Sequence, residues 1–186
     1  MNKKDIRAKF LKIRSLLTKE FKISSSKRIC GLLLDYLNSH EQIELVIGYS
    51  AINNEVDISS FLQKCLDRKI LVFLPYYLEV EKKYILKKIE SLDSDLELGK
   101  YNIPEPKENK LNLNISQLTA QNSLWLVPGI AFDINSNRIG FGKGYYDAIL
   151  RQAIGKKIGV AFSCQISKTA IPQNQNDIPM DFVVSA

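Results

Sequence analysis

The chain has 186 residues, 45% hydrophobic and 25% charged, which is the balance of an ordinary globular protein and enough for one well-buried domain. No apolar run approaches the roughly 20 residues of a membrane-spanning helix, and the charged start lacks the apolar stretch of a signal peptide, so we expect a cytoplasmic protein without a membrane partner. The net charge of +6 allows an anionic partner, but the lysines are dispersed, which favours a phosphate-bearing small molecule over nucleic acid.

The apolar pattern predicts two helices at the start of the chain. The stripe of the first helix consists of Ile6, Phe10, Ile13, Leu17 and Phe21, which fall on one helical face. The three serines at 24–26 offer hydroxyl groups for the N-cap of a second helix, whose stripe covers residues 29–37. This interpretation puts the boundary between the two helices after Phe21.

Beyond the second helix, short apolar runs alternate with helical patterns. Strands are expected at 45–49, 70–74, 84–86, 124–127, 158–162 and 182–184, and helices at 58–66 and 145–153. The strand at 70–74 is expected to end at Pro75, and the polar, proline-containing residues 94–122 predict a loop with little regular structure. Unbroken apolar strands between helices are typical of a mainly parallel sheet covered on both faces. We therefore expect one α/β domain over residues 1–186, a three-layer helix–sheet–helix fold whose ligand lies beyond the carboxyl ends of the strands.

The cysteines and the one histidine give no sign of a nucleophilic or zinc centre. Cys30, Cys65 and Cys164 are too widely spaced for a disulfide framework or a zinc site. Cys30 and Cys65 fall on apolar positions of helical patterns, where a free thiol packs as a small hydrophobe. His40 follows the second helix and is expected at the surface.

The strongest chemical signal is the segment Arg138–Asp147, which reads RIGFGKGYYD. Its three glycines alternate with other residues just before a predicted helix, so the backbone can approach a ligand and point N–H groups at it. A helix N-terminus adds a positive dipole end, which suits phosphate. Arg138 and Lys143 supply cations, and Asp147 supplies a hard oxygen for Mg²⁺. From glycine spacing alone, a phosphate site and a tight structural loop fit equally well.

Two familiar nucleotide motifs are excluded at this segment. A P-loop requires glycine where the chain has Asn137 and a hydroxyl residue where it has Gly144. A dinucleotide-binding turn requires G-x-G-x-x-G at the first strand–helix junction, whereas this G-x-G-x-G pattern comes late in the chain.

The run Leu126–Asp133, continued by Arg138–Asp147, resembles the signature of the 5-formyltetrahydrofolate cyclo-ligase family. Further matches are the K-x-x-x-R pair of Lys3 and Arg7, the segment 50–57 with its Glu-Val-Asp triplet, and the aromatic-N-I-P-x-P loop at 101–106. The resemblance covers nearly the whole chain, including the closing residues 177–184. It departs from the family in having tyrosine rather than tryptophan at 101, and asparagine rather than histidine at 176.

This resemblance implies an ATP-dependent ligase that converts 5-formyltetrahydrofolate to 5,10-methenyltetrahydrofolate with release of ADP and phosphate, through phosphorylation of the formyl oxygen and ring closure. It implies Mg²⁺ as cofactor and ATP as co-substrate; we expect a monomer, although the sequence does not fix the oligomeric state. The implied ATP-binding residues are Lys3, Lys4, Arg7, Arg138, Ile139, Gly140, Phe141, Gly142, Lys143, Gly144, Tyr145 and Tyr146. The implied folate-binding residues are Ser50, Glu55, Tyr101, Gly142, Gly144, Tyr145 and Tyr146. Arg138 and Lys143 are the implied catalytic residues, and Asp147 and Asp177 the metal ligands.

Each of these roles has a structural alternative at this point. Lys3 and Arg7 lie one helical turn apart, as on a solvated helix face. Glu55 is equally placed to cap a turn that includes Asn53, Asn54 and Asp57. Tyr101 could pack its own loop, Asp147 could be an ordinary first-turn acid, and Asp181 could replace Asp177 at the metal.

Two other functions also stay open. One is a transferase or isomerase on a related α/β scaffold that uses the glycine segment for a phosphorylated sugar or coenzyme A. The other is a binding module for a partner such as RNA that recognises a basic patch, with strongly salt-dependent affinity.

Overall fold

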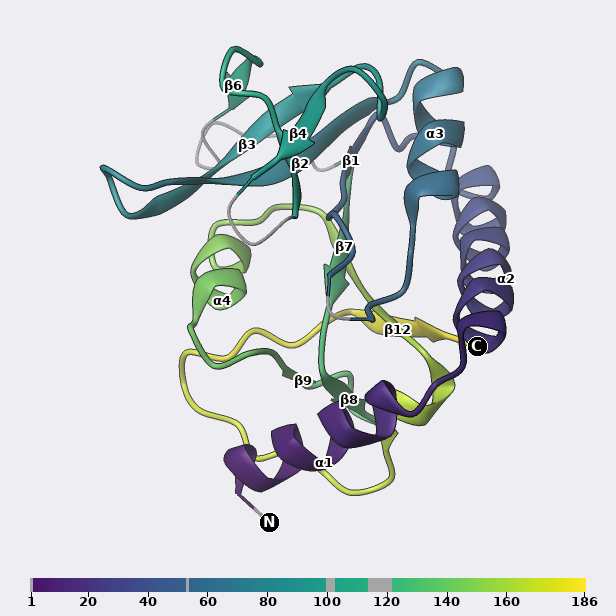
Figure 1. Cartoon of the computed structure of the whole chain (residues 1–186), viewed down its shortest axis with the longest axis vertical. Helices are drawn as coiled ribbons and strands as arrows, with labels where there is room; N and C mark the ends of the chain where they lie inside the picture. The colour runs from purple at the N-terminus through teal and green to yellow at the C-terminus, as the bar shows by residue number, and fades with distance from the viewer. Residues whose placement is uncertain (1, 53, 100–102, 114–121) are drawn as a thin grey trace.

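A seven-stranded sheet forms the centre of the computed structural model, which describes residues 2–52, 54–99, 103–113 and 122–186 (Figure 1). In sheet order the strands are β12 (Phe182–Ser185), β10 (Lys156–Ala161), β7 (Ser123–Pro128), β1 (Leu45–Ile47), β2 (Leu71–Leu78), β3 (Lys83–Ile89) and β6 (Asn112–Leu113). The strands from β12 to β2 pair in parallel, and β3 and β6 continue the sheet in antiparallel fashion. The predicted mainly parallel sheet is therefore confirmed.

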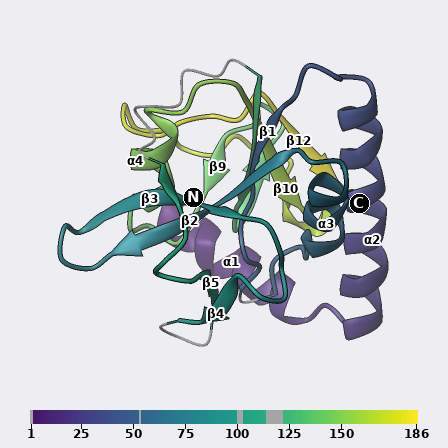
Figure 2. The same ribbon diagram turned by 90° about the horizontal axis from the view of Figure 1, so that it is seen from above.

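Helices cover both faces of this sheet. Figure 2 shows α2 (Lys19–Asn38) and α3 (Ser59–Asp67) on one side and α4 (Tyr145–Leu150) on the other. Val46 of β1 packs in the cluster that includes α2 and α3, whereas its neighbours Leu45 and Ile47 pack in the cluster that includes α4. Because alternate residues of the strand meet different helices, the whole strand is apolar, and the predicted three-layer fold is confirmed.

The first helix, α1 (Lys3–Ser15), packs beside a second, three-stranded sheet. That sheet has the order β11 (Ile166–Ser167), β8 (Ala131–Asp133) and β9 (Arg138–Ile139). A short 3₁₀-helix, Ser163–Gln165, immediately precedes β11. Ile6 and Phe10 of α1 are buried against Ala131 and Ile139. This packing brings the amino end of the chain to the start of the glycine segment.

The predicted boundary between the first two helices was wrong. The first helix ends at Ser15 and the second begins at Lys19, because the Thr18 side chain accepts a hydrogen bond from the Phe21 N–H (3.2 Å) and caps α2. Of the serines expected to cap, Ser26 lies buried inside α2, where its hydroxyl accepts from the Asp57 N–H (3.1 Å).

The strand predicted to end at Pro75 continues to Leu78 as β2. The pairing of β2 with β1 stops at Phe73, so on the side that faced β1 the strand has no partner at Pro75. Proline lacks a backbone N–H, and here that lack breaks no hydrogen bond between β1 and β2. On its other side, Pro75 pairs with Leu86 of β3.

The expectation of an irregular loop over residues 94–122 was also wrong for part of that range. Two short strands, β4 (Leu96–Leu98) and β5 (Pro104–Pro106), form an antiparallel hairpin, and β6 joins the edge of the main sheet. The helix expected to reach residue 153 is shorter and ends at Leu150.

The cysteines behave as expected: all three are free, with Cys30 and Cys65 buried. The helices within the described ranges are all too short or too polar to cross a membrane.

Candidate active site

A cavity of about 640 Å³ lies at the edge of the sheet where β1 and β7 end. Tyr49 and Ser50 follow β1 and reach the cavity, and so do Pro128 and Gly129 at the end of β7. Parallel strands end at the same edge of a sheet, so the cavity lies where the sequence predicted the ligand. The predicted site residues that line it are Lys3, Arg7, Ser50, Glu55, Arg138, Ile139, Gly140, Phe141, Gly142, Lys143, Gly144, Tyr145, Tyr146, Asp147 and Asp177.

Two predicted residues are not brought to this cavity by the described structure. Lys4 is exposed and is not among the lining residues. Tyr101 lies outside the described residues, as do Asn53 and Asn102. The roles given to Lys4 and Tyr101 therefore stay predictions.

Arg138 occupies the inner end of the cavity. Its guanidinium Nη2 donates to Asp147 Oδ1 (2.9 Å), and its side chain is only 5% exposed. Its Nε is buried without a hydrogen-bond partner in the described ranges, so Asp147 satisfies only part of this cation. A Cβ on Gly140 would lie 2.6 Å from Arg138 Nη1, so the glycine is needed for the guanidinium to lie where it does.

Two of the cations of α1, Lys3 and Arg7, line the cavity together with the glycine segment. Arg7 Nε donates to the Gly140 carbonyl (2.9 Å), and Lys3 forms an ion pair with Asp177. Gly142 has a φ of +88°, and a Cβ there would lie 2.9 Å from Arg7 Nη2. Lys3 and Arg7 thus lie on one helix face because of their spacing, and that face turns toward the cavity rather than toward open solvent.

The positive charge of this end comes mainly from side chains. The helix that follows the glycine segment, α4, has only six residues, so its dipole contributes less than the sequence interpretation assumed. Gly144, at its N-cap, has a φ of +70° and supplies no side-chain cap. We assign the cationic character of the cavity to Lys3, Arg7, Arg138 and Lys143, together with Arg151, a further lining residue that sequence reasoning missed.

Another part of the cavity wall is aromatic. Tyr77 and Tyr84 form a cross-strand pair of β2 and β3, with ring centroids 5.0 Å apart, and Tyr145 lies 5.2 Å from Tyr84. Burial raises the pKa of Tyr84 to about 12, so this ring stays a neutral phenol. Sequence reasoning missed Tyr77 and Tyr84. They could have been found by predicting that β2 continues past Pro75 and pairs with β3, which places the two tyrosines opposite each other.

Glu55 combines the two roles that its sequence left open. Its Oε2 accepts a hydrogen bond from the Ile52 N–H (3.1 Å), and its own N–H donates to the Ile52 carbonyl (2.9 Å), so it closes a turn. It also lines the cavity. Burial raises the pKa of Glu55 to about 7, against the opposing effects of the Ile52 N–H, Arg14 and Arg138.

Arg14 supports the cavity wall from behind and was also missed. It is 1% exposed, and its Nη1 donates to the Gly129 carbonyl (3.1 Å), which accepts a second hydrogen bond from Gln165 Nε2 (2.7 Å). Burial lowers the pKa of Arg14, and the nearby Glu55 carboxylate opposes this effect. The spacing of Arg14 from Arg7, two helical turns, was the available signal.

The acids of the cavity fit a metal that arrives with a nucleotide. Asp147 and Asp177 both line the cavity, whereas Asp181 accepts a hydrogen bond from the Lys157 N–H (2.6 Å) and is not a lining residue. No cluster of three or more His, Cys, Asp or Glu side chains able to hold a metal occurs within the described ranges. Mg²⁺ commonly takes one or two carboxylates and completes its shell with phosphate oxygens and water, which this pair of acids allows.

Comparison with known proteins gives consistent matches. A family model described as the 5-formyltetrahydrofolate cyclo-ligase family matches residues 1–186. The 5-formyltetrahydrofolate cyclo-ligase of Haemophilus influenzae is 25% identical over 183 residues, covering 96% of this chain and 94% of that protein. The solved 5,10-methenyltetrahydrofolate synthetase of Aquifex aeolicus is 31% identical, with a TM-score of 0.81 over 100% of this chain and 90% of that chain. The synthetase structure from Mycoplasma pneumoniae, at 24% identity and a TM-score of 0.78 over 99% and 98% of the two chains, shares the fold.

Proposed function

The chain belongs to the 5-formyltetrahydrofolate cyclo-ligase family, and from this premise we propose that it converts 5-formyltetrahydrofolate and ATP to 5,10-methenyltetrahydrofolate, ADP and phosphate in the presence of Mg²⁺. The observation that carries this proposal is a single cavity lined by cations and glycines and also by tyrosines and the half-buried Glu55. A phosphate chain suits the first set of residues and a pterin ring suits the second.

The need for ATP follows from the chemistry of the substrate. The oxygen of a formamide is a poor leaving group, so the neighbouring amine nitrogen cannot close the ring unaided. In the proposed reaction the formyl oxygen attacks the γ-phosphorus of ATP, the bond from that phosphorus to the bridging oxygen breaks, and ADP leaves. The neighbouring nitrogen then attacks the formyl carbon and loses its proton, and the carbon–oxygen bond breaks as phosphate departs.

The cationic end would act by positioning and by neutralising charge. Arg138 and Lys143 would contact the transferring phosphoryl group, and the free N–H groups of the segment Gly140–Gly144 would hold its neighbours. Lys3 and Arg7 would fix the rest of the phosphate chain. The substrate supplies its own nucleophile, which agrees with a site built from cations rather than from a nucleophilic side chain.

The metal has a defined place in this proposal. Asp147 and Asp177 would hold Mg²⁺ together with phosphate oxygens, directly or through water. When bound, the ion supplies positive charge to the phosphoryl oxygens. Both acids are paired with cations of the same end, Arg138 and Lys3, so nucleotide binding would exchange these ion pairs for contacts with phosphate and metal.

The aromatic end would bind the folate. Glu55 would accept hydrogen bonds from N–H groups of the pterin ring, and Tyr146 and Tyr101 would flank the folate. That the monomer is the active form stays a prediction. A cytoplasmic location and the lack of an RNA partner stay predictions.

The test is to mix purified protein with 5-formyltetrahydrofolate and Mg²⁺-ATP and to follow the near-ultraviolet absorbance of the methenyl product. We expect the band to grow with ATP and to stay flat without it. A flat trace from folded protein that still binds ATP would refute the proposed substrate, and a sugar phosphate or coenzyme A would then be tested. Salt-dependent retention of RNA by protein that neither binds nor hydrolyses ATP would refute the enzyme class.

A further inference from the structure

The β4–β5 hairpin forms one wall of the folate end of the cavity. Ile103, Pro104 and Glu105 line the cavity, and β5 packs against β2 and β3. In the described structure this hairpin is a two-stranded sheet of its own, hydrogen-bonded along its length only to itself. Its position over the main sheet is therefore set by contacts other than strand pairing.

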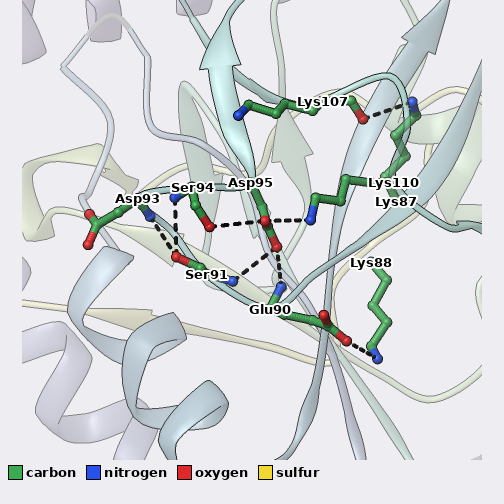
Figure 3. A network of polar contacts seen from close by, with 9 residues as sticks. All are labelled: Lys87, Lys88, Glu90, Ser91, Asp93, Ser94, Asp95, Lys107 and Lys110. Atoms are coloured by element: carbon green, nitrogen blue, oxygen red, sulfur yellow. Dashed lines mark hydrogen bonds and ion pairs between the residues drawn. The ribbon is translucent and has the colours of Figure 1, made fainter.

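One set of contacts holds the start of the hairpin (Figure 3). Asp95, immediately before β4, is 5% exposed, and its carboxylate accepts hydrogen bonds from the Glu90 and Ser91 N–H groups (2.8 and 3.1 Å). Lys110, beyond β5, forms an ion pair with Asp95 (2.5 Å), and the Lys107 N–H donates to the Asp95 carbonyl (2.9 Å). Burial acts to raise the pKa of Asp95, but Lys110 and the two N–H groups outweigh it and hold the pKa at about 2.

A second contact holds the end of the hairpin to the main sheet. Lys87 of β3 is 1% exposed, and its ammonium donates to the carbonyls of Lys107 (3.1 Å) and Glu108 (2.6 Å), as Figure 3 shows in part. The same ammonium lies 3.9 Å from the centroid of the Tyr76 ring. A buried strand position normally carries an apolar residue, because burying an ammonium is costly unless its donors are satisfied. Here the two carbonyls that accept from the ammonium directly follow β5, and the aromatic ring beside it belongs to β2.

We propose that Lys87 and Asp95 are positioning residues for the folate substrate, because together they fix both ends of the β4–β5 hairpin and so hold its cavity-facing residues in place before folate binds. This inference rests on the proposed function. The gain is in affinity, since a wall that is ordered in advance loses less conformational freedom on binding. The cationic end is built from α1 and the segment Arg138–Asp147, and the hydrogen bonds and ion pairs of Lys87 and Asp95 given above reach neither of them.

The test uses two variants and a matched control. Lys87→Met keeps the aliphatic stem and removes the donors, and Asp95→Asn keeps the shape and removes the charge. Lys88→Met is the control, because the neighbouring Lys88 pairs with the carboxylate of Glu90, which is 71% exposed. We expect the KM for 5-formyltetrahydrofolate to rise about tenfold in the first two variants, with kcat and the KM for ATP changed by less than about twofold. The control should match wild type in all three constants.

Hydrogen exchange of the hairpin provides a readout that does not depend on turnover. The Gly99 N–H donates to the Ile103 carbonyl and the Lys107 N–H to the Asp95 carbonyl (both 2.9 Å). These two amides should exchange faster in the Lys87→Met and Asp95→Asn variants than in the control, and saturating 5-formyltetrahydrofolate should slow them again.

Three outcomes would overturn the inference. They are an unchanged KM for folate, an equal rise in the KM values of both substrates, and unchanged exchange of Gly99 and Lys107. If Lys87→Met does not fold, Lys110→Met tests the Asp95 anchor at the start of the hairpin from a side chain that is 26% exposed, with the same expected results. Failure of the proposed function is distinguishable, because wild-type protein would then form no methenyl product while the exchange measurement still reports on the anchor.

Discussion

Replacing Glu55 by glutamine should stabilise the protein at alkaline pH while impairing its proposed activity. Glutamine has the same shape and retains an oxygen that can accept from the Ile52 N–H, but it carries no charge. Burial raises the pKa of Glu55 from 4.5 to about 7. At about 1.4 kcal/mol per pH unit, ionising this half-buried carboxyl costs the folded state up to about 3 kcal/mol relative to the unfolded chain.

The sign of the pH dependence follows from where the proton is held more tightly. The folded state has the higher pKa, so wild-type protein keeps the full stability of the neutral Glu55 below pH 4.5 and loses it as the pH rises through about 7. Glu55→Gln avoids this loss. Its free energy of unfolding should exceed that of wild type by up to about 3 kcal/mol near pH 8, and the two should converge near pH 4.

Urea unfolding followed by circular dichroism across this pH range measures the difference, and Glu41→Gln at an exposed position is the control. The KM for 5-formyltetrahydrofolate should rise in Glu55→Gln, because an acceptor for the pterin N–H groups is lost. A variant that is less stable than wild type by the same amount at every pH would refute the reasoning, since it would mean that desolvation does not dominate at this carboxyl.

Three further results are expected. Arg138→Ala should lower kcat by about a thousandfold without unfolding the protein, as judged by circular dichroism, and near-wild-type turnover would contradict its role at the phosphoryl group. Gly142→Ala should raise the KM for ATP alone, because the φ of +88° at this position is strained for alanine and the new Cβ would crowd the Arg7 guanidinium. The control is Gly31→Ala, inside α2 with open space around it, which should stabilise the protein and leave both KM values unchanged. Asp177→Asn should raise the Mg²⁺ concentration that gives half-maximal activity, whereas Asp181→Asn should not, and equal effects of the two would place the metal elsewhere.

The central strands could be predicted from the sequence because their surroundings are uniform. Both faces of β1 are buried, so Leu45, Val46 and Ile47 are all apolar and form an uninterrupted run. The first helix boundary could not be predicted in the same way, since Thr18 and the serines at 24–26 are all good caps. Tertiary structure decides between them, because Ser26 is used by the Asp57 N–H.

The candidate site was predictable where its residues are close in sequence and not where packing assembles it. The segment Arg138–Asp147 carries its chemistry in ten consecutive positions. Tyr77 and Tyr84 meet only because β2 continues through a proline and pairs with β3. The β4–β5 hairpin was missed because each of its strands has only three residues, and two of the three residues of β5 are prolines. Charged side chains, rather than an apolar pattern that the sequence would reveal, hold the hairpin in place.

The most direct test of the proposed chemistry is to follow the formyl oxygen. Wild-type protein would be given 5-formyltetrahydrofolate labelled with ¹⁸O in the formyl group, together with unlabelled Mg²⁺-ATP, and the released phosphate analysed by mass spectrometry. If the γ-phosphoryl group is transferred to the formyl oxygen, each phosphate should carry one ¹⁸O atom for each methenyl product formed. Unlabelled phosphate, released in step with the product, would mean that ATP is hydrolysed by water and that the formyl oxygen is not the phosphoryl acceptor.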